Sequence, residues 1–213
     1  MGFGWLLVGY FFANVMSLYA PLSFAKLIGY PMMVYGLYLL AHYHDRFRYC
    51  WYFSFTSLPF ALYFSFYGFA QLGIGTQWWI LGGIFFQVVE WAYAGMTLIL
   101  HVMLLYAIIG LCSELKLIGI QINAYRNLIM VGLYYVLYLV ARLPFSFMQT
   151  NAGMFALPLV LLRIFFLILN MMLIFNCHRY ICPEGDEYMS EPIFKKRNKS
   201  TEDGDGEGTD DEA

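Results

Sequence analysis

From Gln77 to Ser113 the sequence is apolar almost without a break, so this stretch must be buried in protein or in lipid. A helix over these 37 residues would be roughly 55 Å long at ~1.5 Å per residue. One bilayer crossing takes about 20 apolar residues. Only Gly95 offers a turn between two crossings. We therefore expect a membrane-spanning helix here, and the surrounding charges decide how often it crosses.

Five other apolar runs are long enough to cross a bilayer. They lie at about 3–22, 27–43, 50–72, 127–148 and 153–176. The predicted fold class is therefore all-α, a polytopic membrane helical bundle. With one crossing in 77–113, the bundle has six transmembrane helices and occupies residues 1–176. The remainder, 177–213, is predicted to be a cytoplasmic tail that is disordered and acidic from about residue 200.

Charge distribution favours six crossings over seven. Only 12% of the residues are charged, against about 25% in soluble domains. In membrane proteins, the basic residues of short loops gather on the cytoplasmic side. With six spans, the only basic residue of the outer segments is Lys26, and the inner segments hold Arg46, Arg48, Lys116, Arg126, Arg179, Lys195, Lys196, Arg197 and Lys199. Seven spans would move one of the basic clusters outside. We expect both termini in the cytoplasm and the protein in the plasma membrane.

A polar stripe follows the helix predicted over 77–113. Its members are spaced alternately four and three residues apart, which puts them on one helix face. They are Gly83, Gln87, Glu90, Ala94, Thr97 and His101. Such a face is costly to expose to lipid, so it is expected to turn toward the bundle interior.

Polar faces on other predicted spans complete a candidate intramembrane site. By helix rise, Glu90 lies ~18 Å and Arg163 ~15 Å from the outer starts of their spans, near the midplane. Arg142 is placed nearer the outer surface. The predicted site consists of Glu90, Arg163, Arg142, His101, Gln87, Tyr135, Tyr138 and Asn170.

Two interpretations of these charges remain open. Glu90 and Arg163 could form a buried ion pair that only fixes helix packing. Alternatively, the charges and tyrosines line a cavity, and two arginines against one carboxylate favour an anion. The second interpretation predicts a permease-like or ligand-binding bundle with a net-positive interior. The first predicts a non-catalytic scaffold or partner subunit of a membrane complex.

The predicted partners are the lipid bilayer, a small anionic solute or lipid headgroup, and a membrane protein, with no nucleic acid. No phosphate-binding loop, dinucleotide-binding pattern, zinc-protease motif or nucleophile elbow is present. We therefore expect no enzyme activity, catalytic residue, cofactor or metal ion. The cysteines are expected to be free thiols at cytoplasmic span ends, and they are Cys50, Cys112, Cys177 and Cys182.

Two segments resemble a known group. "SLPFALYFSFYG" at 57–68 and "CHRYICPEGDEYMSEP" at 177–192 are similar to segments of uncharacterised multi-pass membrane proteins from bacteria. The two stretches cover 28 residues. The resemblance implies a membrane bundle and no particular activity.

Overall fold

The computed structural model describes residues 2–72, 83–142 and 152–181, with the side chains of 152–155 left out. In these ranges the chain consists of helices joined by short turns and contains no strand, which confirms the predicted all-α class. The helices are α1 (Gly2–Tyr10), η1 (Phe11–Val15), η2 (Met16–Leu18), η3 (Ala20–Ala25), α2 (Lys26–Ala41), α3 (Asp45–Ser54), α4 (Ser57–Gln71), α5 (Gly83–Glu114), α6 (Ile118–Ala141) and α8 (Ala152–Ile181). The predicted tail falls outside the described residues, apart from 177–181, which continue α8.

Within the described ranges, four helical stretches are long and apolar enough to cross a membrane, which indicates a membrane protein. They are Pro21–Ala41, Gly83–Glu114, Ile118–Ala141 and Ala156–Ile181. The span predicted at 3–22 corresponds to a shorter apolar segment, Gly2–Leu18. There the α-helix passes into a π turn and then a 3₁₀ turn.

The region predicted as one span at 50–72 is divided between α3 and α4. Pro59 explains the division, because it lacks the N–H that would bond to the carbonyl of Phe55 in a continuous helix. That carbonyl instead accepts a shorter-range bond from the N–H of Leu58 at 3.1 Å. The hydroxyl of Thr56 bonds back to the carbonyl of Phe53 at 2.6 Å. The prediction of a single helix over 50–72 is therefore wrong.

The long apolar run forms one uninterrupted helix over its described part, Gly83–Glu114. The helix ends where Lys116 takes a left-handed conformation, with φ of 56°. The N–H of Leu117 then bonds to the carbonyl of Cys112 at 2.9 Å, which closes the last turn as in a Schellman motif. This short connection sends α6 back alongside α5. The helix predicted to start at 127 therefore begins at Ile118.

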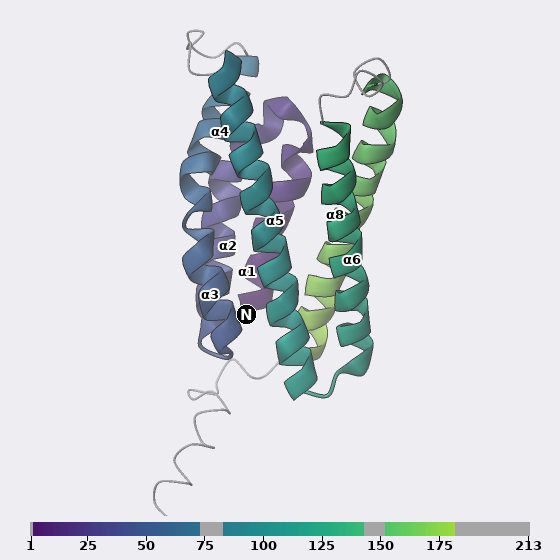
Figure 1. The fold of residues 1–213 in the computed structure, drawn as a ribbon. Helices are drawn as coiled ribbons and strands as arrows, with labels where there is room; N and C mark the ends of the chain where they lie inside the picture. The colour runs from purple at the N-terminus through teal and green to yellow at the C-terminus, as the bar shows by residue number, and fades with distance from the viewer. Residues whose placement is uncertain (1, 73–82, 143–151, 182–213) are drawn as a thin grey trace, which may run out of the picture.

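The helices run up and down along a common axis and close into a ring (Figure 1). α1 packs against α2 and α8, α2 against α3 and α4, α3 and α4 against α5, α5 against α6, and α6 against α8. The ring brings segments from the whole chain around one interior. The site described below lies in the half of the bundle in which α5 and α8 begin and α6 ends.

Glycines bring α1 and α2 into close contact on one side of the ring. A Cβ atom on Gly9 would lie 2.5 Å from the backbone nitrogen of Met33, and one on Gly36 would lie 2.6 Å from that of Leu6. Such distances leave no room for a larger residue. This contact fixes α2 against α1, and with it the position of Lys26 at the start of α2.

Candidate functional site

Glu90 on α5 pairs with Arg142 at the end of α6. Two parallel hydrogen bonds connect the groups, from Arg142 Nη1 to Glu90 Oε2 at 2.8 Å and from Nη2 to Oε1 at 2.6 Å. The guanidinium also lies over the ring of Tyr138, at 5.0 Å from its centroid. A bidentate pair of this kind is the strong form of the arginine–carboxylate contact.

The sequence left open whether Glu90 pairs with Arg163, and the structure pairs Glu90 with Arg142 instead. α5 packs directly against α6, whereas α8 lies on the far side of α6 in the ring. Arg142 lies at the end of α6, the helix next to α5, so its guanidinium is close enough to bind the carboxylate of Glu90. Among the residues that the structure describes, Arg163 has no hydrogen bond or ion pair.

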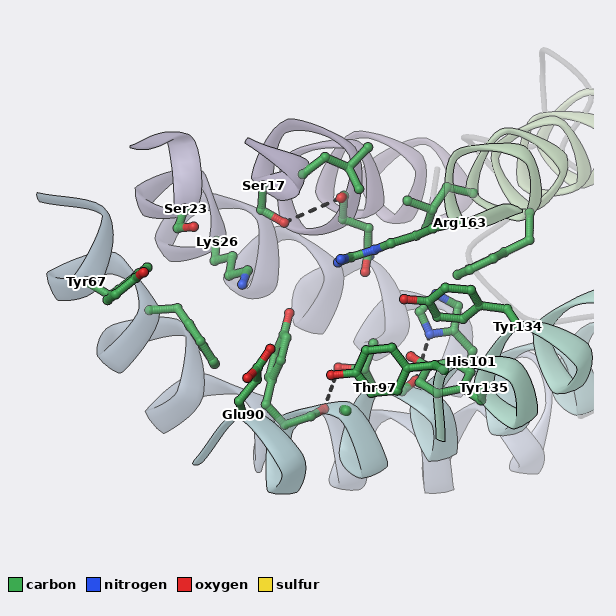
Figure 2. Close-up of a pocket in the computed structure, with 18 residues that line it drawn as sticks. Ser17, Ser23, Lys26, Tyr67, Glu90, Thr97, His101, Tyr134, Tyr135 and Arg163 are labelled. Atoms are coloured by element: carbon green, nitrogen blue, oxygen red, sulfur yellow. Dashed lines mark hydrogen bonds between the residues drawn. The ribbon is translucent and has the colours of Figure 1, made fainter. Parts of the chain in front are cut away.

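Beside this ion pair the ring surrounds a cavity of about 180 Å³ that both polar and apolar side chains line (Figure 2). Side chains from every part of the ring except α1 and α3 line it. They are Asn14, Ser17, Leu18, Ser23, Lys26, Phe64, Tyr67, Glu90, Tyr93, Ala94, Thr97, His101, Tyr134, Tyr135, Tyr138, Arg163, Phe166 and Leu167. The cavity therefore joins residues separated by more than 100 positions in the sequence.

Two cationic side chains enter this cavity without a carboxylate of their own. Lys26 is only 5% exposed, and its ammonium lies 4.1 Å from the ring centroid of Phe64 and 4.5 Å from that of Tyr93. Figure 2 shows Lys26 and Arg163 entering from different elements, with their nitrogen atoms pointing toward one another and Glu90 on the α5 side. In the described ranges neither cation forms an ion pair. With Arg142, three cations surround one carboxylate.

Hydroxyl groups lie around the two cations. Thr97 donates to the carbonyl of Tyr93 at 2.7 Å, and Ser17 to that of Ala13 at 2.6 Å, so their oxygens keep only acceptor capacity. Ser23 is 5% exposed, and its hydroxyl has no hydrogen-bond partner among the described residues. Ser23 therefore adds a neutral donor to a cavity that already holds two cationic ones.

A directed hydrogen-bond chain forms the wall of the cavity at His101. Nδ1 of His101 lies 2.7 Å from the carbonyl of Thr97, which can only accept, so Nδ1 carries the proton. Nε2 is then a bare acceptor for the hydroxyl of Tyr10 at 2.9 Å. The oxygen of Tyr10 in turn accepts from Asn170 Nδ2 at 3.2 Å. This geometry corresponds to a neutral imidazole, so His101 adds no charge to the cavity.

The structure therefore brings together seven of the eight residues predicted for the site. Glu90, His101, Tyr135, Tyr138 and Arg163 line the cavity, and Asn170 joins through the hydrogen-bond chain. Arg142 is attached to the site through Glu90. Gln87 lies exposed on α5 and does not line the cavity.

Sequence reasoning missed Lys26, which it placed in a loop outside the membrane. The only available signal was that Lys26 is the one basic residue of the predicted outer segments. The 3₁₀ turn η3 carries the chain back into the bundle before α2 begins, which buries the lysine. Among the described residues no group of three His, Cys, Asp or Glu side chains is placed to hold a metal ion.

No protein-family model, curated protein or solved structure matches the chain. The resemblance of 57–68 and 177–192 to bacterial multi-pass membrane proteins stays a prediction.

Proposed function

We propose that this chain is an integral membrane protein that binds a small anion or an anionic headgroup in its interior and acts as a permease-like or ligand-binding bundle. One observation carries the proposal: Lys26 and Arg163 point into one cavity, and Glu90, its carboxylate, is already held by Arg142. A buried cation without a counter-ion is costly. An anion bound between Lys26 and Arg163 would remove that cost.

The shape of the cavity also supports an anion of limited size. Its volume of about 180 Å³ lies below the ~300–1,000 Å³ typical of drug-sized ligands. A lysine ammonium, an arginine guanidinium and the Ser23 hydroxyl together supply the donors that a phosphate or carboxylate group requires. The chemistry fits a tetrahedral or planar oxyanion.

We further propose that the bundle crosses the plasma membrane six times with both termini in the cytoplasm. Support comes from the up-and-down order of the helices (Figure 1) and from Arg46, Arg48, Lys116 and Arg179, which lie at one end of the bundle. Basic residues of that kind favour the cytoplasmic side.

Cysteine labelling tests this orientation. Cys50, Cys112 and Cys177 are buried and make poor reporters. In a chain with Cys182 replaced by Ser, we expect an impermeant maleimide added outside intact cells to label Leu72→Cys and not Lys116→Cys. Both positions are exposed, at opposite ends of the bundle. The reverse labelling pattern would contradict the orientation.

Anion binding is tested with ethyl phosphate as the probe, by calorimetry on the full chain in phosphatidylcholine nanodiscs. We expect the parent to bind and Arg163→Gln to weaken binding by at least ~10-fold, because a charge-assisted hydrogen bond contributes about 1.5–3 kcal/mol. The control is Arg46→Gln, which removes a guanidinium that lies over Tyr106 away from the cavity. A parent that binds no ethyl phosphate, or equal losses in both variants, would refute the proposal. Uptake of phosphate into vesicles holding the protein then separates a permease from a binding protein.

The alternative function, a scaffold or partner subunit, is favoured by the Glu90–Arg142 pair, which joins two adjacent helices. If the pair only fixes packing and no anion binds, co-purification of a second membrane protein becomes the informative experiment.

A further inference from the structure

A second hollow adjoins the cavity, between α6 and α8. It has a volume of about 310 Å³. Ala141 from α6 and Ala156, Leu159 and Val160 from α8 form an aliphatic part of its walls, and two tyrosines and two arginines form the polar part. Because only two neighbouring helices of the ring line it, this hollow is a groove along the seam between α6 and α8.

The groove and the cavity share three side chains, Tyr134, Tyr138 and Arg163. Among the residues that the structure describes, only α6, Arg142 at its end and α8 contribute to the groove. The shared side chains therefore separate the two spaces at the α6–α8 seam. Val160, on the groove wall, is 52% exposed, so the groove opens to the outside of the bundle, where a membrane helix faces lipid.

We propose that this groove receives the apolar chain of a single-chain anionic amphiphile whose acidic headgroup binds at Arg163 and Lys26. The inference rests on the proposed function and specifies its ligand class. The cavity alone is too small for a whole amphiphile, whereas the groove reaches the lower end of ordinary ligand volumes. The ligand enters sideways from the bilayer, between α6 and α8.

Charge complementarity selects this occupant over a neutral lipid tail. Arg163 lies where the groove meets the cavity and has no ion-pair partner among the described residues. Arg142 adds positive potential at the margin, although Glu90 already occupies its two terminal nitrogens. A neutral chain would leave Arg163 uncompensated, and a cationic amphiphile would be repelled.

The test compares two probes with the same phosphate group, dodecyl phosphate and ethyl phosphate, on the full chain in phosphatidylcholine nanodiscs. Val160→Trp fills the groove. Its matched control is Leu161→Trp, which makes the same change at the next residue of α8, where the side chain is 58% exposed and does not line the groove. Ala156→Phe provides a second groove-filling variant if Val160→Trp fails to fold.

We expect Val160→Trp to weaken dodecyl phosphate binding by at least ~10-fold, since the tryptophan ring takes the space in which the dodecyl chain would pack against α6 and α8. Leu161→Trp should change it by less than about 2-fold, and neither variant should change ethyl phosphate binding. The inference is overturned if the parent and Val160→Trp bind dodecyl phosphate equally, or if both tryptophan variants lose binding equally. In either case, binding of ethyl phosphate by the parent still supports the proposed function. Loss of ethyl phosphate binding in Val160→Trp also overturns it, because the groove would then be part of the headgroup site. Failure of the parent to bind either phosphate refutes the proposed function itself.

Discussion

Glu90→Gln is expected to lower the free energy of unfolding by about 2 kcal/mol, and adding Arg142→Gln should restore most of that loss. Glu90 accepts two hydrogen bonds from Arg142, at 2.6 and 2.8 Å. Without the carboxylate, an arginine on a membrane helix has no counter-ion, which costs ~2.5–3.5 kcal/mol at the bilayer centre and less toward its surface. The double variant removes both charges and leaves two amides that can bond to one another.

The measurement is unfolding of the purified chain in mixed micelles with increasing dodecyl sulfate, for the parent, both single variants and the double variant. The control is Glu114→Gln, which removes a carboxylate that is 52% exposed and pairs with His44 at 3.3 Å. Exposed pairs contribute about 0–1 kcal/mol, so this variant should change stability little. If Glu90→Gln is as stable as the parent, the pair is not a structural element of the bundle.

The sequence predicted the helical elements best where the apolar pattern was long. The region 77–113 shows why, because its described part is one helix that contains no Pro and is not interrupted at Gly95. The division between α3 and α4 was less visible, since Ser54, Thr56 and Ser57 are small residues that also suit close helix packing and the one breaking signal is Pro59. Hydrophobicity alone therefore found apolar helices and missed a break inside one of them.

Which charges meet was not predictable from the sequence. The stripe spacing placed Glu90 and His101 on one face of α5, and both line the cavity. Depth arguments placed Glu90 and Arg163 at similar levels, yet depth carries no information about which helices are neighbours. The pairing of Glu90 with Arg142 depends on the order of helices around the ring. That order comes from packing, such as the close α1–α2 contact at Gly9 and Gly36.

Lys26→Met is expected to raise the stability of the bundle while weakening anion binding. The Lys26 ammonium is 5% exposed and has no carboxylate partner among the described residues. Its contacts with the rings of Phe64 and Tyr93 are each worth about 0.5–2 kcal/mol. Desolvation of a buried ion costs several kcal/mol. Methionine keeps the apolar stem and removes the charge, so we expect a net gain of about 1–3 kcal/mol.

The same unfolding assay measures this gain, and Arg46→Met is the matched control. Arg46 lies over the ring of Tyr106 at 4.4 Å and is only half-buried, so its loss removes a cation–π contact without relieving a buried charge. We expect that variant to be slightly destabilised. If Lys26→Met is destabilised as much, the ammonium acts as a packing group, and the anion site loses its main support.

Added ligand should then stabilise the parent but not Lys26→Met. A ligand that binds only the folded state stabilises it by RT ln(1 + [L]/Kd), about 2.7 kcal/mol at 100 times Kd. Saturating ethyl phosphate should therefore stabilise the parent and leave Lys26→Met nearly unchanged. The cost of burying Lys26 would then be explained, because the folded bundle keeps an uncompensated cation that the bound anion neutralises. A variant that is more stable without ligand and still responds to ethyl phosphate as strongly as the parent would place the anion elsewhere than at Lys26.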